Sequence, residues 1–226
     1  MTTPTITFVR HAQGFHNLST ANHSIRDPLL TDLGKTQCQT LHDKFPYSSE
    51  VDCIVASPLK RTIYTAMYSF PAKTKELGII TLPDVQETSD LPCDTGSDKE
   101  DILTEFANKG VQLDLHLLTD DWHSKKGRSA PEQDAIEART RDARKWLKAR
   151  KEKHIVVVVC LGCSGWYRES IADIVTDTWR CSALFDRRLD RPCQVRGMTP
   201  TDQYEVRLSL TSVKRELAGP IQVCIS

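Results

Sequence analysis

Short apolar runs bounded by polar or turn-forming residues set the pattern of this chain. The runs at residues 6–9, 51–56 and 79–82 have the length and β-branched content of buried strands. A further run at residues 155–159 is continuously β-branched, which is typical of a strand covered on both faces. The pattern predicts a sheet of short strands in which residues 155–159 form a central member.

Apolar residues also recur at helical spacing between these runs. Thr31 can cap a helix that ends near Pro46. Its repeat consists of Leu33, Gln37, Leu41 and Phe45. A second helix is expected near Pro58, because proline loses least at a first helical position, and Arg61 then lies in its first turn.

Three further helices and an edge strand complete the predicted order. Residues 102–106 indicate a short helix, and residues 132–151 give the clearest amphipathic pattern in the chain. The apolar side of that longer helix is expected to hold Ile136, Ala143 and Leu147. After the central strand a helix is expected through residues 171–174, and residues 204–210 alternate as an edge strand does.

Strands that alternate with helices imply a fold class. We expect an α/β three-layer sandwich, with a mostly parallel central sheet and helices on both faces. At 226 residues the chain fits a single domain spanning residues 1–226. Two long loop excursions, 88–100 and 108–130, interrupt the regular pattern, and long loops in compact domains are often functional.

Charge and composition limit the classes of partner. The 30 basic and 30 acidic residues balance, so we expect no nucleic-acid or membrane partner. No apolar run approaches the roughly 20 residues that span a bilayer, and the N-terminal residues lack the pattern of a signal peptide. We therefore expect a cytoplasmic protein whose 8 cysteines are reduced thiols.

Candidate chemistry begins where the first predicted strand ends, at the adjacent Arg10 and His11. Ligands of open α/β sheets bind at the carboxyl ends of the strands. Arg10 offers a fork of donors to an anion, and His11 offers a nitrogen that can accept a phosphoryl group or a proton. Arg61 can reach the same crevice from the start of its helix. The alternative is a surface arginine beside a structural histidine.

Three motifs occur in order along the chain. The first is Arg10-His11-Ala12-Gln13 with Asn17. The second is Ser57-Pro58-Leu59-Lys60-Arg61-Thr62 with Thr65-Ala66, and the third is Glu87 upstream of Pro92-Cys93-Asp94-Thr95-Gly96. Together they resemble the histidine phosphatase superfamily in its phosphoglycerate-mutase-like branch, and they are most similar to fungal-type members. The resemblance covers about residues 5 to 180.

The resemblance implies a mechanism. His11 matches the family's nucleophile, which becomes a phosphohistidine, and Glu87 matches the acid that protonates the leaving oxygen. The substrate- and phosphate-binding positions correspond to Arg10, Gln13, Asn17 and Arg61. No metal and no other cofactor is expected, because the arginines supply the positive charge that phosphoryl transfer needs.

The sequence departs from the family pattern at Leu161 and at the nearby Cys163-Ser164-Gly165-Trp166. The family carries a second histidine after its valine-rich strand, and Leu161 stands there in this chain, within Cys160-Leu161-Gly162-Cys163. Loss of one preorganised donor typically costs about 10² to 10³ in rate. Leu161 also adds apolar surface to the expected phosphate pocket.

Three hypotheses about function follow from this departure. The first is a weakened phosphatase that retains the chemistry of His11. The second is a repurposed isomerase, dehydratase or cyclase in which His11 and Glu87 act on a small apolar metabolite. The third is an inactive binding protein, since a fold does not fix a function. The partner is expected to be a small molecule, phosphorylated or apolar, and a homodimer is compatible with the sequence.

The spacing of Cys160 and Cys163 has its own alternatives. It fits a redox pair or half of a zinc site, with Cys93 as a further thiol near the crevice. We expect neither, because the sequence holds no second paired-ligand motif and small thiols commonly fill tight turns. His16, beside the expected pocket, is interpreted as a wall residue.

Overall fold

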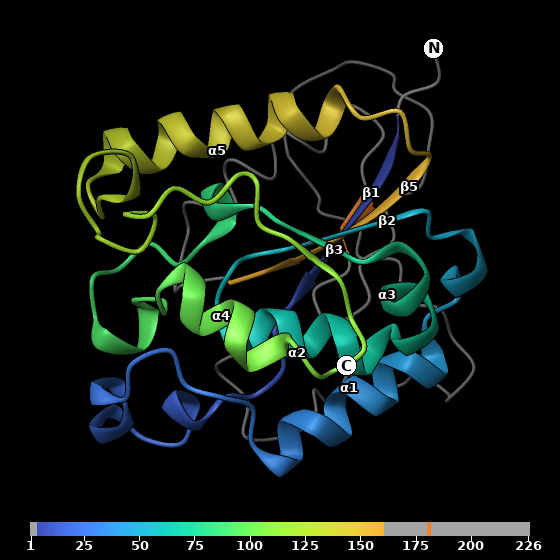
Figure 1. Cartoon of the computed structure of the whole chain (residues 1–226), viewed down its shortest axis with the longest axis horizontal. Helices are drawn as coiled ribbons and strands as arrows, with labels where there is room; N and C mark the ends of the chain where they lie inside the picture. The colour runs from blue at the N-terminus through green and yellow to red at the C-terminus, as the bar shows by residue number, and fades with distance from the viewer. Residues whose placement is uncertain (1–3, 161–179, 182–226) are drawn as a thin grey trace, which may run out of the picture.

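Six strands form one sheet in the computed structural model, which describes residues 4–160 together with 180 and 181 (Figure 1). The strands are β1 (Thr5–Arg10), β2 (Cys53–Ala56), β3 (Ile79–Thr81), β4 (Leu113–Asp114), β5 (His154–Val159) and β6 (Arg180–Cys181). Their spatial order is β4-β3-β2-β5-β1-β6, and neighbouring strands run parallel. The four predicted strands that fall on described residues are confirmed.

Strand β5 lies between β1 and β2. Val157 is in register with Phe8 on one side and with Val55 on the other. All six residues of β5 are buried, as its continuous β-branched sequence predicts for a strand covered on both faces. The ends of β1 and β2 are thereby fixed on either side of the end of β5.

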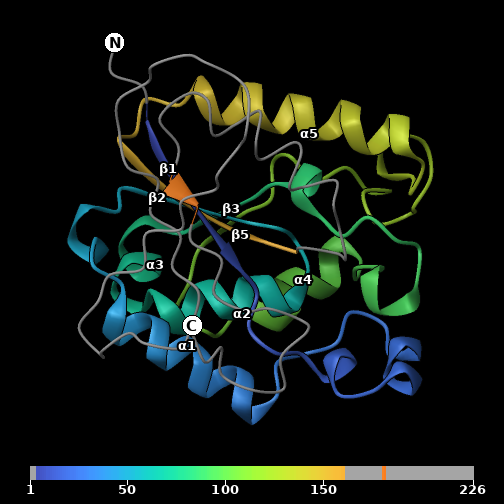
Figure 2. The same cartoon turned by 180° about the vertical axis from the view of Figure 1, so that it is seen from behind.

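Helices cover both faces of this sheet. They are α1 (Asp32–Lys44), α2 (Lys60–Ser69), α3 (Pro71–Leu77), α4 (Lys99–Phe106) and α5 (Gln133–Lys148). Helix α5 lies on one side, and the other four lie on the opposite side (Figures 1 and 2). This arrangement is the expected α/β three-layer sandwich.

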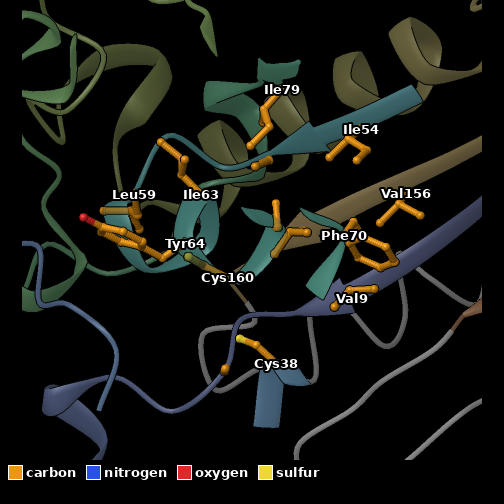
Figure 3. Packing of buried hydrophobic residues seen from close by; sticks show 14 of the residues in the cluster. Val9, Cys38, Ile54, Leu59, Ile63, Tyr64, Phe70, Ile79, Val156 and Cys160 are labelled. Carbon is orange, nitrogen blue, oxygen red and sulfur yellow. The ribbon is translucent and has the colours of Figure 1, made fainter. Parts of the chain in front are cut away.

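Each face of the sheet carries its own hydrophobic cluster, because side chains alternate along a strand. Val156 belongs to the cluster that also holds Ile63 and Phe70 from the α2 side (Figure 3). Its neighbour Val157 belongs to the cluster that holds Leu147 of α5. Full burial of one such side chain stabilises the fold by about 1.5 to 3 kcal/mol.

The structure confirms the cap of α1 and corrects its buried face. The Thr31 hydroxyl accepts the N–H of Gly34 at 3.0 Å, as predicted. Leu33 is 53% exposed, however, and the buried positions of the helix are Gly34, Cys38 and Leu41. The face is set by close packing: a Cβ on Gly34 would lie 2.2 Å from the carbonyl oxygen of Gln13.

Helix α5 also differs from its prediction. It ends at Lys148, and Ile136 is only half-buried, although Ala143 and Leu147 are buried as expected. Arg139 occupies the buried face because its guanidinium donates to the carbonyl oxygens of residues 84, 86 and 87. The sequence pattern did not predict a buried arginine there, because the acceptors of its hydrogen bonds lie 52 to 55 residues earlier in the sequence.

Both predicted loop excursions contain short ordered elements. Residues 88–100 hold a 3₁₀ turn at Pro92–Asp94 and the start of α4, and residues 108–130 hold β4 and a 3₁₀ turn at Gly127–Ser129. The predictions for residues 171–174 and 204–210 lie outside the described residues. Within the described part of the chain, no helix combines the length and the apolar character that crossing a membrane requires.

Candidate active site

Three strand ends bring the site together. His11 follows β1, Ser57 follows β2 and Cys160 follows β5. The N–H of His11 donates to the carbonyl oxygen of Val159 at 3.0 Å, and the N–H of Ser57 donates to that of Val158 at 2.9 Å. Because these three strands are adjacent and parallel, residues that are far apart in sequence meet at one edge of the sheet.

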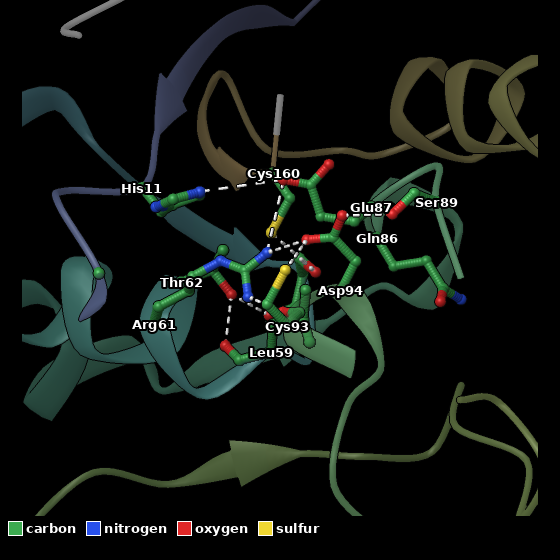
Figure 4. A network of polar contacts seen from close by, with 12 residues as sticks. His11, Leu59, Arg61, Thr62, Gln86, Glu87, Ser89, Cys93, Asp94 and Cys160 are labelled. Carbon is green, nitrogen blue, oxygen red and sulfur yellow. Dashed lines mark hydrogen bonds and ion pairs between the residues drawn. The ribbon is translucent and has the colours of Figure 1, made fainter. Parts of the chain in front are cut away.

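His11 is the central group of this cluster. It is 1% exposed, and its Nδ1 lies 2.7 Å from the carbonyl oxygen of Ala12. A carbonyl only accepts, so Nδ1 carries the proton and Nε2 carries the lone pair. Among the described residues Nε2 has no hydrogen-bond partner, and it lies 4.0 Å from Oε1 of Glu87 (Figure 4).

The surroundings favour the neutral imidazole. Burial is the main cause that lowers the pKa of His11 well below its usual value, and the charges of Arg61 and Arg10 and the neighbouring His16 lower it further. The hydrogen bond to Ala12 acts in the opposite direction. At neutral pH the lone pair on Nε2 is therefore available for bond formation.

Arg61 is fully buried opposite the histidine. One guanidinium nitrogen donates to the carbonyl oxygen of Cys93 at 2.7 Å, and the other lies 3.4 Å from Glu87 and 3.2 Å from Asp94 (Figure 4). Ser89 donates to the second oxygen of Asp94 at 2.6 Å. A guanidinium held between two carboxylates is positioned to exchange them for another anion with matching geometry.

Charges and hydrogen bonds relate the predicted site residues to one another in different ways. His11, Arg61 and Glu87 lie together, and Arg10 is 7% exposed and close enough to act on His11 by charge. The side-chain oxygen of Gln13 accepts from Thr31 at 2.7 Å, and that of Asn17 accepts from the N–H of Gly14 at 2.9 Å. These two oxygens organise the chain after β1. Leu161, also predicted in the site, lies outside the described residues.

Other residues join the site although sequence analysis gave them no part in it. Asp94 lies within the third motif and pairs with Arg61. Lys125 donates to Oε1 of Gln86 at 3.1 Å and to the carbonyl oxygen of Glu87 at 3.0 Å. Burial is the main cause that lowers the pKa of Lys125 to about 8. The sequence feature that could have identified Lys125 is its position in the basic cluster that follows Trp122.

Two further histidines, His16 and His123, contact residues of the site or of the first loop excursion. The ring of His16 is buried, and its centroid lies 5.5 Å from that of His11, which agrees with a wall residue. Nε2 of His123 lies 3.1 Å from Asp98, in the first loop excursion.

Polar contacts hold the first loop excursion in place. Oδ1 of Asp27 accepts the N–H of Lys60 at 3.0 Å, at the start of α2. Its Oδ2 accepts from the N–H and the hydroxyl of Ser97 at 3.1 and 2.8 Å. Arg26 donates to the carbonyl oxygen of Gly96 at 2.9 Å. These bonds connect residues 88–100 to the segment before α1 and to the helix that carries Arg61.

A separate cavity of about 670 Å³ lies beside α5. Leu82, Trp122 and Trp146 are among its lining residues, and His11, Arg61 and Glu87 are not. Arg139 lines it and also donates to the carbonyl oxygen of Glu87. The cavity is thus distinct from the cluster around His11.

This chain belongs to the histidine phosphatase superfamily, branch 1, whose sequence profile matches residues 6–179. A probable phosphatase of Schizosaccharomyces pombe is 32% identical over 106 residues, covering 45% of this chain and 49% of that protein. Phosphoglycerate mutase-like protein 2 of Arabidopsis thaliana is 32% identical over 133 residues, covering 53% of this chain and 39% of that protein. This chain therefore matches about half or less of the length of these two relatives.

A longer sequence match and a solved structure of similar fold extend the comparison. A phosphoglycerate mutase-like protein of Arabidopsis thaliana is 27% identical over 191 residues, covering 68% of this chain and 69% of that protein. The crystal structure of ecdysone phosphate phosphatase from Bombyx mori, in complex with tungstate, has a TM-score of 0.51 at 13% identity. The matched region covers 91% of this chain and 84% of the chain in that crystal structure. At this identity the likeness shows the fold.

Proposed function

We propose that this chain hydrolyses phosphomonoesters through a phosphohistidine formed at Nε2 of His11. The observation that carries the proposal is a buried, neutral imidazole whose Nε2 lies 4.0 Å from Glu87, beside the fully buried Arg61. Phosphoryl transfer requires an aligned nucleophile and positive charge on the equatorial oxygens, with little other covalent work. His11 supplies the first, and Arg61 with Arg10 supplies the second.

In the first half of the reaction, Nε2 of His11 attacks phosphorus and the bond to the ester oxygen breaks. Glu87, 4.0 Å from Nε2, takes up a proton from solvent when the substrate phosphate displaces it from Arg61, and gives that proton to the leaving oxygen. The substrate phosphate takes over donors of Arg61 that now face Glu87 and Asp94. The products are a phosphohistidine and a free alcohol.

In the second half, water attacks the phosphohistidine. The carboxylate of Glu87 accepts the proton of that water, the bond from nitrogen to phosphorus breaks, and inorganic phosphate leaves. The neutral imidazole and the protonated carboxyl are then restored. Nδ1 keeps its proton throughout and donates it in a hydrogen bond to the carbonyl oxygen of Ala12, so Nε2 remains the reacting nitrogen.

The replacement at Leu161 sets the expected rate. Because leucine cannot donate a hydrogen bond to the phosphate, we expect a rate about 10² to 10³ lower than that of a site with a histidine at this position. We propose a small phosphorylated molecule as substrate, selected by residues 88–100 and 108–130, in a single domain spanning residues 1–226. The name of the Schizosaccharomyces pombe relative, a probable phosphatase, supports this class of reaction.

A hydrolysis assay with a generic aryl phosphate tests the proposal. The proteins compared are the wild type, His11→Ala, Leu161→His and the control His116→Ala, whose imidazole is exposed and pairs with Asp114. We expect slow turnover by the wild type and the control, no turnover by His11→Ala, and a gain in Leu161→His. Rapid quenching with a labelled ester should trap an acid-labile phosphoenzyme only where His11 is present.

Two outcomes would overturn the proposal. Turnover that persists in His11→Ala would place the chemistry on another residue. A wild type that neither turns over nor becomes labelled would favour the non-phosphatase enzyme or the inactive binding protein, and a gain in Leu161→His would then mark an intact but unused phosphate pocket.

A further inference from the structure

Three potential metal ligands converge in the cluster around His11. A ring nitrogen of His11, a carboxylate oxygen of Glu87 and Sγ of Cys160 all lie within 4.8 Å of one another, and Nε2 of His11 lies 4.0 Å from Oε1 of Glu87. All three residues are buried. They come from separate segments, after β1, after β3 and after β5, so their convergence is a product of the fold.

The protonation state of His11 suits a metal as well as a phosphoryl group. Its Nδ1 proton faces the carbonyl oxygen of Ala12, so the lone pair of Nε2 points away from that bond. That nitrogen is buried and has no hydrogen-bond partner within the described residues. A carbonyl on the second ring nitrogen is also the usual outer-shell partner of a metal-bound histidine.

The donor set selects the class of cation. One imidazole, one thiolate and one carboxylate match zinc and similar thiophilic ions, whereas magnesium and calcium prefer oxygen ligands. Three protein ligands also leave one position of a tetrahedral ion open. The 4.0 Å between Nε2 of His11 and Oε1 of Glu87 means that these side chains must close in slightly around an ion.

The charges around the cluster are mixed. The positive charges of Arg61 and Arg10 disfavour a cation, while the negative charges of Asp94 and Asp27 offset that of Arg61. Binding also converts the Cys160 thiol to a thiolate and releases its proton to solvent, so the dication adds only one net positive charge. Arg61 lies close enough to stabilise that thiolate.

We propose that His11, Glu87 and Cys160 form a site for a zinc-class divalent cation, and that the metal-bound form is inactive. The inhibitory part rests on the proposed function, because the metal occupies the same Nε2 that would attack phosphorus. Metal binding itself does not depend on it. A chelator should therefore raise the activity of protein that carries the ion.

Cobalt titration of the full chain tests binding directly. Thiolate-bound Co²⁺ gives a charge-transfer absorption that oxygen- or nitrogen-bound Co²⁺ lacks, and Zn²⁺ should displace it. The variants are Cys160→Ser, His11→Ala and the control Cys38→Ser. Cys38 lies on the buried face of α1, in the hydrophobic cluster on that side of the sheet. We expect one Co²⁺ per chain and an unchanged band in Cys38→Ser. Cys160→Ser should lose the band, and His11→Ala should bind at least about tenfold more weakly.

Inhibition is measured in parallel, with each protein compared with its own rate in chelator. Zn²⁺ should inhibit the wild type and Cys38→Ser at concentrations at least about tenfold lower than Cys160→Ser. No charge-transfer band, or a band that survives in Cys160→Ser, would overturn the site. If the charge-transfer band changes as expected in the variants but neither the wild type nor any variant hydrolyses a phosphate ester, the metal site is supported and the proposed function is wrong.

Discussion

The indole of Trp122 fills the space that a side chain on Gly96 would need. A Cβ on Gly96 would lie 2.0 Å from Cη2 and 2.5 Å from Cζ2 of Trp122. Trp122 is 2% exposed, so the ring has little room to move away. The two loop excursions, 88–100 and 108–130, are therefore packed against each other at this point.

Gly96→Ala should disturb this packing. Overfilling a packed site typically costs about 1 to 3 kcal/mol, and here the strain falls on the segment that also carries Asp94. We expect a lower urea midpoint and a higher KM for phosphate esters. The double variant Gly96→Ala with Trp122→Leu should recover part of the loss, because the smaller side chain leaves room for the methyl group. Strictly additive effects would show that the clash is not the cause.

Asp27 should be important for stability. Its carboxylate accepts three hydrogen bonds, from the N–H of Lys60 and from the N–H and hydroxyl of Ser97. Asp27→Ala leaves buried donors without an acceptor, at a cost of about 1 to 3 kcal/mol each, and places alanine at a φ of 44°.

Asp27→Asn should cost less than Asp27→Ala in urea unfolding. Asparagine tolerates the positive φ and keeps one oxygen, although its amide nitrogen then faces a donor. The control is Asp32→Ala, an exposed residue paired with Lys35. Equal losses for Asp27→Asn and Asp27→Ala would mean that the second carboxylate oxygen carries the effect.

Glu87→Gln should separate leaving-group protonation from the rest of catalysis. Activated aryl phosphates need little help from an acid, whereas alkyl phosphates need the proton, so the loss should reach about 10² to 10⁴ only for the alkyl esters. The measurement is kcat/KM across esters of increasing leaving-group pKa. Glu100→Gln, at an exposed position in α4, is the matched control. An equal loss for every ester would contradict the role of Glu87 as the acid.

His11 should remain neutral at mildly acidic pH. Burial first, and then the charges of Arg61 and Arg10, hold its pKa well below the ordinary value of 6.5. The folded protein therefore keeps the neutral form at pH 6, where an unfolded chain would be largely protonated. Nitrogen-detected NMR of chelator-treated protein, with His11→Asn for assignment, should show an unprotonated Nε2 at pH 6. A ring with both nitrogens protonated at that pH would contradict the burial argument.

Local sequence patterns were sufficient for the order of elements. The continuous β-branched run at 155–159 predicted the fully buried strand β5, and Thr31 predicted the start of α1, because both signals act over a few residues. The buried face of α1 was wrong at Leu33, since it depends on the contact between Gly34 and the backbone of Gln13. Strand β4, with two residues, is too short to give a periodic signal.

The motifs named His11, Arg61 and Glu87 as candidates, and residue identity alone carried that information. Their states depend on long-range packing: burial makes His11 neutral, and Arg61 is held by Glu87 and Asp94. Cys160 enters the cluster because β5 lies between β1 and β2. Hydrophobic periodicity acts within one element, whereas desolvation and charge pairing act between elements, so the chemistry of this site emerges only when parallel strands bring their ends together.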